Sequence, residues 1–248
     1  MSRKRVCMLD WLRGGAILLV VAYHILYDLA FMTPLPVPAW LTPGHPAVEA
    51  VHVGFLWVLF AVSGICSGYS RNLLRRGVLL YLAGFGVTVV TTLFLPDYGI
   101  VFGVLSGFGA CMVLTALAAP LLDRIPWPIL TALGVLLWLV FRTFHKDGVL
   151  HLGFAEMAPA LPDVRYLYPL GIAHPSFTSV DYFPVIPYFF MFLAGRGLHR
   201  PVSRGSFPKW FYRSHGRVLE WIGRHSLIIY AVHQPILLGI LWLVDRLL

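Results

Sequence analysis

The sequence predicts an all-α integral membrane protein, a bundle of about seven transmembrane helices in a single domain, residues 1–248. Of its residues, 58% are hydrophobic and only 12% are charged, whereas soluble domains carry about 25% charged residues. The mean hydropathy is +0.77. Apolar stretches of about 20 residues, the length that crosses a bilayer as a helix, recur along the whole chain.

The seven stretches follow one another with short connections, apart from two longer ones. Windows of about 20 residues place the spans at 14–32, 51–70, 77–95, 100–121, 127–144, 183–199 and 224–244. The basic N-terminus resembles a signal peptide, but the apolar run after it is too long and contains ionisable residues, so we expect an uncleaved first span. In the second and fourth spans, Gly64-x-x-x-Gly68 and Gly103-x-x-x-Gly107 favour close helix packing.

The basic residues are distributed unequally between the two sides of the predicted bundle. Fifteen of the nineteen lie on the side of the N-terminus, including Arg3, Lys4 and Arg5, and the other four are Arg142, Lys146, Arg165 and Arg246. This asymmetry predicts a cytoplasmic N-terminus and an external C-terminus in the plasma (inner) membrane. It also explains the net charge of +8 without a nucleic-acid partner. We expect membrane lipids as partners, and the sequence leaves a homodimer open.

The first span combines apolar and ionisable residues in the stretch LDWLRGGAILLVVAYHILYD. In a helix, Arg13 and His24 lie ~16 Å apart along the axis, about half of the ~30 Å hydrocarbon thickness. Arg13 would lie near a membrane face and His24 near the midplane. Arg13 and Asp10, three residues before it, are candidate substrate-binding residues. An ionisable residue at that depth is costly and by default functional. Asp28, one turn beyond His24, would fix the imidazole tautomer and raise its basicity. His24 and Asp28 are therefore the candidate catalytic residues, and the alternative is a buried histidine bonded to a backbone carbonyl.

The last span repeats this pattern. His233 and Gln234 lie ten residues into RHSLIIYAVHQPILLG, again near mid-depth, and Pro235 weakens the helical hydrogen bonds there. Their depth makes these two residues candidates for substrate binding.

Two further groups are candidates for substrate binding. Arg71, Arg75 and Arg76 lie between the second and third spans on the basic side. Asp181 and Tyr182 open the sixth span, at the end of the long 145–182 segment, which we expect to fold over the outer mouth of the bundle. The histidines of that segment lack metal-ligand spacing, so no metal site is expected.

The 200–222 segment is basic and aromatic. We interpret it as a cytoplasmic linker on anionic lipid, in preference to a site that holds a phosphorylated cofactor.

Taken together, these motifs resemble a known family. The stretches LDWLRGG…VAYHILYD, SGICSGYSRNLLRRG, FGVLSGFGACMVL, DYFPVIPYFFMFLAG and GRHSLIIYAVHQPIL resemble, in this order, bacterial members of the heparan-α-glucosaminide N-acetyltransferase catalytic-domain family. The spacing of Arg13 and His24 is also similar to that in the acyltransferase-3 membrane enzymes. The resemblance implies a membrane acyltransferase that moves an acetyl group from cytoplasmic acetyl-CoA, its co-substrate, to an extracytoplasmic sugar or glycan. It implies a base at His24 and cations for the phosphates of CoA at Arg13, with Arg71, Arg75 or Arg76 nearby. It also implies that His233 and Gln234 polarise the thioester carbonyl or position the acceptor.

Two departures from the family pattern matter. Ser106 stands where the family motif in the fourth span has a histidine. In the eukaryotic branch of the family, the histidine lies in the segment after the first span. Resemblance to that branch would imply His45 or His52 as the base. We favour His24, because Asp28 lies beside it.

Three other functions remain open. The main alternative is a proton-coupled transporter or flippase of a glycan or lipid, with His24 and Asp28 as a proton relay. Acyl-CoA binding would distinguish the enzyme from it. A haem cytochrome with His24 and His233 as axial ligands would show a Soret band. The last alternative is a scaffold that binds no ligand.

Overall fold

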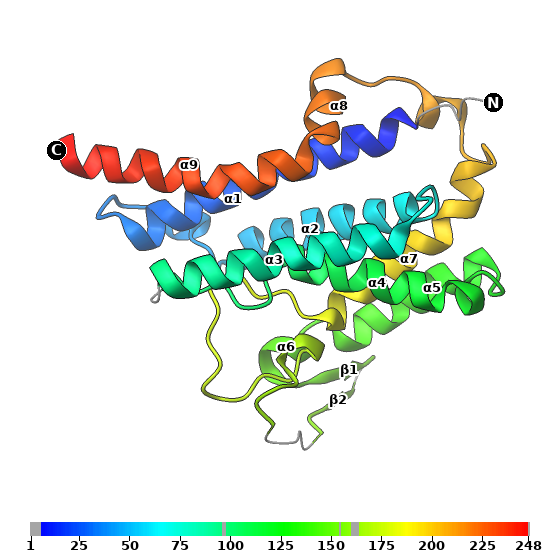
Figure 1. Ribbon diagram of the computed structural model, residues 1–248, viewed down its shortest axis with the longest axis horizontal. Helices are drawn as coiled ribbons and strands as arrows, with labels where there is room; N and C mark the ends of the chain where they lie inside the picture. Colours follow the sequence, from blue (N-terminus) through cyan, green and yellow to red (C-terminus); the bar gives the residue numbers. More distant parts are fainter. Residues whose placement is uncertain (1–5, 96–97, 154, 160–163, 248) are drawn as a thin grey trace. The chain divides into compact units, whose positions relative to one another are not determined.

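The computed structural model describes residues 6–95, 98–153, 155–159 and 164–247, so Arg3, Lys4 and Arg5 lie outside the described residues. Seven long helices correspond to the predicted stretches: α1 (Cys7–Met32), α2 (Pro46–Ser67), α3 (Leu73–Phe94), α4 (Val104–Leu122), α5 (Trp127–Phe141), α7 (Val185–Ser203) and α9 (Ser226–Leu247). Figure 1 shows them in chain order.

Six helical segments of the described residues are long and apolar enough to cross a membrane, and they include every long helix except α7. The C-terminal half of α7 carries Arg196, His199 and Arg200, which lower its hydropathy. The multi-pass, largely helical architecture is confirmed. The count of seven spans and the sides of the two termini stay predictions.

Short elements complete the described chain. Two short helices are α6 (Phe144–Asp147) and α8 (Arg217–Arg224), and three 3-10 turns are η1 (Ala39–Leu41), η3 (Tyr168–Leu170) and η4 (Lys209–Tyr212). Strands β1 (Leu150–Leu152) and β2 (Ala155–Met157) form an antiparallel pair in which Leu150 faces Met157. The 200–222 segment, interpreted as a linker, thus contains the end of α7 and most of α8.

The chain divides into two compact units, and the division falls within α2. Unit 1 consists of Met1–Val62 with Gly205–Leu248, and unit 2 of Ser63–Arg204. The expectation of a single domain stays a prediction, and each unit is described by itself.

In unit 1, α8 crosses α1 at very short range. A methyl group on Gly14 would overlap the backbone carbonyl of Leu219, and one on Gly223 would overlap that of Asp10. Glycine is therefore required on both helices at the crossing. From this crossing α9 runs along α1 in the same direction (Figure 1), so that Gln234 reaches Asp28.

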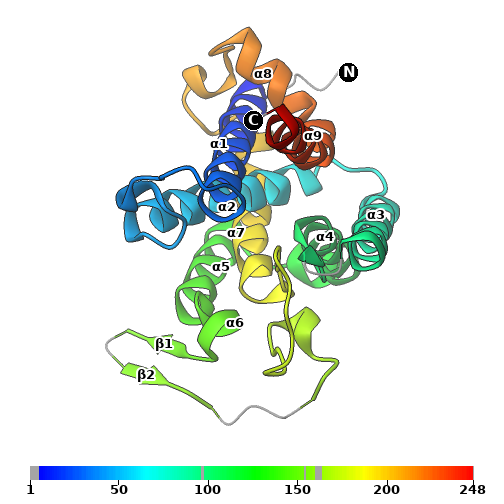
Figure 2. The same ribbon diagram turned by 90° about the vertical axis from the view of Figure 1, so that its left-hand side faces the viewer.

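In unit 2, α3 packs on α4 and α5 packs on α7, as Figure 2 shows. Glycines allow the close contacts, and the predicted close packing at Gly64 and Gly107 is confirmed. A side chain at Gly64 would overlap the Phe192 carbonyl, and one at Gly107 would overlap that of Phe183. Ser106 is buried, with its side chain against Gly84. Leu122, Leu130 and Leu193 form a buried apolar cluster.

Candidate functional site

The centre of unit 1 holds four polar side chains between α1 and α9, which we call the α1–α9 cluster: His24, Asp28, His233 and Gln234. The rings of His24 and His233 lie 4.8 Å apart between centroids and are tilted by 48°. The amide of Gln234 donates hydrogen bonds to both carboxylate oxygens of Asp28, at 3.0 and 3.2 Å. The structure therefore brings together two pairs that the sequence predicted separately, His24 with Asp28 and His233 with Gln234.

Asp28 and His233 are buried and His24 and Gln234 are half-buried, although many apolar side chains of α9 are exposed. Asp28 is 2% exposed and His233 is 7% exposed, whereas Ile228, Val232 and Ile236 on α9 are exposed. Polar side chains thus face inward and apolar side chains outward, as expected for a helix in lipid. A buried carboxylate with only an amide as its hydrogen-bonding side chain is costly unless a positive charge comes near it.

The hydrogen bonding of His233 fixes its tautomer. Its Nδ1 lies 2.6 Å from the backbone oxygen of Tyr230. A carbonyl oxygen only accepts hydrogen bonds, so Nδ1 carries a proton, and in the neutral ring Nε2 then carries a lone pair. That Nε2 is buried and has no hydrogen-bond partner among the described residues, and the same holds for Oε1 of Gln234. Two buried acceptors without partners point to a ligand that donates hydrogen bonds.

The surroundings of His24 include a second histidine from α2. The ring of Tyr23 stacks on His52 at 4.2 Å and meets His24 edge-on at 6.0 Å. His52 in turn lies 3.8 Å from a carboxylate oxygen of Glu49. The electrostatic neighbours of His24 are His233 and His52.

His45, one of the two alternative bases, has a local role in the structure. Its Nδ1 accepts a hydrogen bond from the backbone N–H of Ala47 at the start of α2. Of the two alternatives, His52 is thus the one near His24. The choice of the catalytic base stays a prediction.

The contacts of Asp28 differ from the expected ones. The sequence predicted that its carboxylate would act on His24, one turn earlier. In the structure the carboxylate is bound by Gln234 and interacts electrostatically with His233. The cause is that α9 supplies a donor within reach, which the spacing within α1 does not reveal. A catalytic role for Asp28 stays a prediction.

At the other end of α1, Arg13 lies 3.9 Å from the carboxylate of Asp10, which is itself 7% exposed. This is the local ion pair that the i, i+3 spacing allows. Roles of Asp10 and Arg13 in substrate binding stay predictions.

In unit 2, Arg71, Arg75 and Arg76 line a surface hollow of about 380 Å³ together with Ser70, Asn72 and Leu79. The side chain of Asn72 caps α3 by accepting a hydrogen bond from the N–H of Arg75. Among the described residues the three guanidinium groups make no hydrogen bond or ion pair. Three unpaired cations at the positive end of a helix are unfavourable, which an anion would relieve.

Asp181 and Tyr182 have structural partners in unit 2. Asp181 accepts a hydrogen bond from the N–H of Val104 at the start of α4, and the Tyr182 hydroxyl donates to the carbonyl of Tyr168. Burial raises the pKa of the Tyr182 phenol above its ordinary value. Their proposed role in substrate binding stays a prediction, as does the position of the 145–182 segment over the mouth of the bundle.

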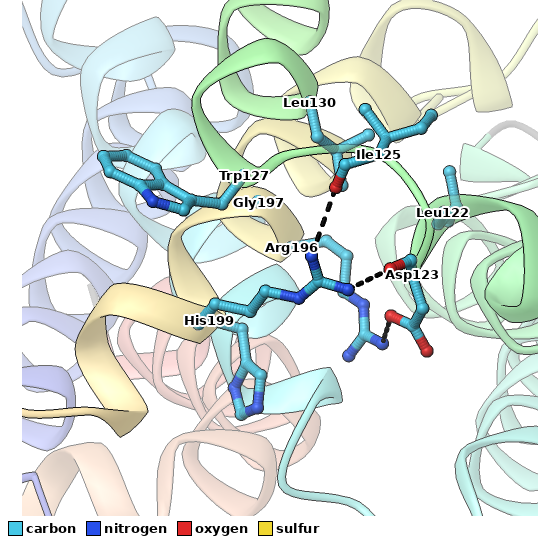
Figure 3. A pocket seen from close by; sticks show the side chains of 9 residues that line it. Leu122, Asp123, Ile125, Trp127, Leu130, Arg196, Gly197 and His199 are labelled. Carbon is cyan, nitrogen blue, oxygen red and sulfur yellow. Dashed lines mark hydrogen bonds and ion pairs between the residues drawn. The ribbon is translucent and has the colours of Figure 1, made fainter.

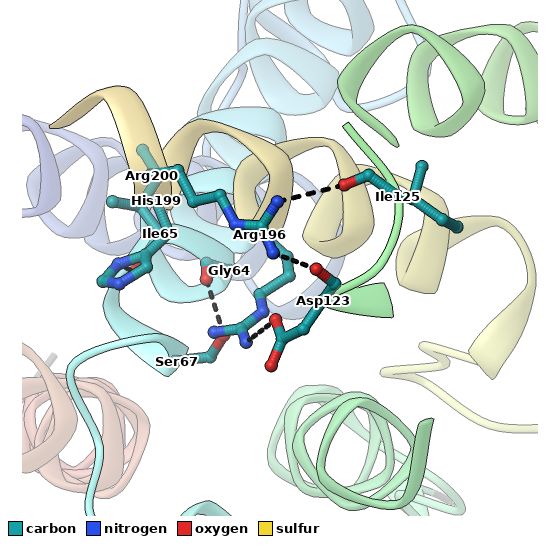
Figure 4. A network of polar contacts seen from close by, with 8 residues as sticks. All are labelled: Gly64, Ile65, Ser67, Asp123, Ile125, Arg196, His199 and Arg200. Carbon is teal, nitrogen blue, oxygen red and sulfur yellow. Dashed lines mark hydrogen bonds and ion pairs between the residues drawn. The ribbon is translucent and has the colours of Figure 1, made fainter. Parts of the chain in front are cut away.

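Sequence reasoning missed a second polar cluster, the Arg196 network of Asp123, Arg196, His199 and Arg200 (Figures 3 and 4). Arg196 binds the carboxylate of Asp123 at 2.7 Å, and Arg200 donates to the carbonyls of Asp123 and Ile125. The Nδ1 of His199 lies 3.0 Å from the carbonyl oxygen of Ile65. Arginines at i and i+4 were the only signal, because their partners lie 73–77 residues away in sequence.

A small cavity of about 30 Å³, room for about one water molecule, lies within this network. Figure 3 shows its lining, from the α4–α5 turn and α7. Within the described ranges, no group of three histidine, cysteine or acidic side chains is arranged to hold a metal ion.

Comparison with known proteins agrees with the motifs quoted above. A model of the family described as heparan-alpha-glucosaminide N-acetyltransferase, catalytic, matches residues 5–235, which include the whole α1–α9 cluster. Neither the curated proteins nor the solved structures provide a match. The chain therefore belongs to the heparan-alpha-glucosaminide N-acetyltransferase catalytic-domain family, and the protein is a multi-pass membrane acetyltransferase.

Proposed function

We propose that this protein transfers the acetyl group of acetyl-CoA from the cytoplasm to a hydroxyl or amine of an extracytoplasmic sugar or glycan. The observation that carries this proposal is the α1–α9 cluster, in which the ring centroids of His24 and His233 lie 4.8 Å apart. Acyl transfer needs a base that removes a proton from the attacking group, and a half-buried imidazole such as that of His24 suits this task. The family match supplies the acetyl chemistry.

In this proposal His24 is the base. One of its nitrogens takes the proton of the acceptor hydroxyl or amine as that group attacks the thioester carbon. The carbon–sulfur bond then breaks, and the CoA thiolate leaves and takes up a proton. The free Oε1 of Gln234 suits a hydrogen bond from the acceptor. Neutral His233 has no spare N–H, so it is poorly suited to polarising the thioester carbonyl.

Arg13 would bind the phosphates of CoA. It lies on the same helix as His24, ~16 Å away along the axis. A long, thin substrate that extends along α1 could therefore place its anionic end at Arg13 and its thioester at His24. Guanidinium groups bind phosphates through charge-assisted, often bidentate hydrogen bonds.

Arg71, Arg75 and Arg76 form a further candidate phosphate site on unit 2. Their hollow of about 380 Å³ is open to solvent-borne anions, and their guanidinium groups are not engaged with described residues. We propose the phosphates of CoA as the ligand. Anionic lipid headgroups share the same chemistry, and competition between CoA and anionic vesicles would separate the two sources.

The direction of α9 supports the predicted seven spans. Gly223, three residues before α9 begins, lies against Asp10, and Gln234 in α9 contacts Asp28. Helix α9 therefore runs in the same direction as α1. Two parallel spans enter from the same side, which requires an odd number of crossings between them. The helices α2, α3, α4, α5 and α7 supply that number only if α7 also crosses. With the basic residues cytoplasmic, the N-terminus is inside and the C-terminus outside, in the plasma (inner) membrane.

The test is acetyl transfer by the purified protein in lipid nanodiscs, from radiolabelled acetyl-CoA to soluble saccharides with free amines or hydroxyls. His24→Ala should lower turnover by ~10²–10⁴-fold, the usual contribution of a general base, while His45→Ala should retain it. Normal turnover in His24→Ala with loss in His45→Ala would move the base to His45. Proton-coupled uptake of a glycan or lipid without acetyl transfer would favour the transporter instead.

A further inference from the structure

We propose that His233 is a positioning residue that receives, through His24, the proton taken from the acceptor, a role that rests on the proposed acetyl transfer and deepens it. The structure suits Nε2 of His233 for this role. Because Nδ1 donates to the Tyr230 carbonyl, Nε2 is the nitrogen without a proton when the ring is neutral. The atom is buried, and no described group donates a hydrogen bond to it. A buried lone pair of this kind costs free energy until a donor forms a hydrogen bond with it.

His24 can become that donor. A neutral imidazole has one N–H, and it has two once its other nitrogen has taken up a proton. The two rings are 4.8 Å apart between centroids and tilted by 48°. A modest ring rotation would direct an N–H of His24 toward Nε2 of His233. The step needs no group from outside the α1–α9 cluster.

The charges around the two rings favour movement of the proton from His24 to His233. His233 interacts electrostatically with the carboxylate of Asp28, which would stabilise an imidazolium. His24 has two other imidazoles, His233 and His52, as its electrostatic neighbours. The nearest carboxylate to His52 is that of Glu49, at 3.8 Å from its ring. Around His233 the facing groups are Asp28 and His24 from α1, and Tyr230 on its own helix.

The proton balance is closed. The acceptor O–H or N–H bond breaks as an N–H bond forms on one nitrogen of His24. The N–H bond on the opposite nitrogen then breaks as Nε2 of His233 gains a proton, and His24 becomes neutral again in its other tautomer. After the carbon–sulfur bond breaks, the reverse transfer delivers a proton to the CoA thiolate. His233 ends neutral, and no oxidant or further reactant is required.

The experiment uses single-turnover acetyl transfer by the full-length protein in nanodiscs, measured in mixtures of H₂O and D₂O. In the wild type, two protons move in the relay, so the rate should fall along a curve as the D₂O fraction rises. His233→Gln cannot carry the second proton. It should lower kcat by roughly 10²-fold, the lower end of the contribution of acid–base catalysis, with the KM for acetyl-CoA unchanged, and the curve should become a line.

The matched control is His225→Gln. The Nδ1 of His225 also lies against a backbone oxygen, that of Trp221 at 2.8 Å, but the residue is outside the α1–α9 cluster. This variant should keep the rate and the curvature of the wild type. A linear dependence in the wild type, which needs no variant to fold, would overturn the relay. Wild-type kcat in His233→Gln would overturn it as well, and in both cases acetyl transfer itself would stand. A wild type that transfers no acetyl group at all would overturn the proposed function and the relay together.

Discussion

The α1–α9 cluster and the Arg196 network are built from similar side chains but are completed differently. Each joins a histidine and a carboxylate from separate helices or turns. In the Arg196 network, Asp123 binds Arg196, and both Arg200 and His199 bond to backbone carbonyls. In the α1–α9 cluster, Nε2 of His233 and Oε1 of Gln234 are buried without a partner among the described residues.

We use this difference to predict which of the two groups is structural and which is reactive. A buried acceptor without a partner costs free energy, which a ligand or a proton that completes it would offset. The Arg196 network ties the end of α7 to the α4–α5 turn, and its groups find their partners within unit 2. We therefore expect changes in unit 2 packing to affect stability, and changes in the α1–α9 cluster to affect turnover.

The largest effect on stability should come from Gly64→Ala, which tests the structural side of the comparison. The new methyl group would overlap the Phe192 carbonyl, and backbone on both sides leaves little room to relax. Overpacking of this kind costs ~1–3 kcal/mol. Thermal unfolding in nanodiscs should show a lower Tm, while the folded fraction keeps its kcat. Gly86→Ala, where nothing lies within 4 Å, is the matched control and should not lower the Tm.

Arg13→Lys should have the next largest effect and tests the donor end of α1. Lysine keeps the charge but cannot make the bidentate contact to a phosphate. The KM for acetyl-CoA should rise by about tenfold, equivalent to ~1.4 kcal/mol, and the KM for the acceptor should stay constant. Steady-state kinetics with both substrates varied measures this. If both constants stayed unchanged, Arg13 would serve only its local ion pair with Asp10, at the end of α1.

The smallest effect should come from Glu220, a half-buried residue of unit 1 whose carboxylate accepts several hydrogen bonds. The hydroxyl of Ser214 and the N–H groups of His215 and Gly216 donate hydrogen bonds to it, which lowers its pKa below the ordinary value. A depressed pKa in the folded state stabilises the protein above the unfolded pKa, and this contribution is lost as pH falls through the folded pKa. Tm measured from neutral pH down to below ~4 should fall less steeply in Glu220→Gln than in the wild type. Identical slopes would show that Glu220 does not stabilise the fold.

Much of the fold follows from the sequence because apolar windows of bilayer length fix the spans independently of tertiary contacts. The α1 and α9 stretches and the mid-depth positions of His24 and His233 were predicted in this way. Helix α8 was missed, because its basic and aromatic residues are equally typical of a surface linker.

The site was predicted only in part, because its contacts are non-local. The donor to Asp28 is Gln234, 206 residues away, and no spacing within α1 reveals it. The tautomer of His233 depends on a backbone carbonyl one turn away, which any residue type at position 230 would supply. Hydrogen-bond satisfaction, which distinguishes the α1–α9 cluster from the Arg196 network, is a property of coordinates and not of composition.

The most direct test compares two isosteric changes, Asp28→Asn and Asp123→Asn, by measuring kcat and Tm in the same nanodiscs. Asparagine keeps an oxygen that can accept from Gln234 or Arg196 but removes the charge. For Asp28→Asn we predict a loss of roughly tenfold or more in kcat, ~1.4 kcal/mol of transition-state stabilisation, with the Tm and acetyl-CoA binding retained. The ion pair of Asp123 is partly exposed. For Asp123→Asn we therefore predict a loss of at most ~1 kcal/mol in the free energy of unfolding, seen as a small fall in Tm, and an unchanged kcat. The reverse result, with kcat lost in Asp123→Asn and only stability lost in Asp28→Asn, would contradict the assignment of the α1–α9 cluster as the reacting site.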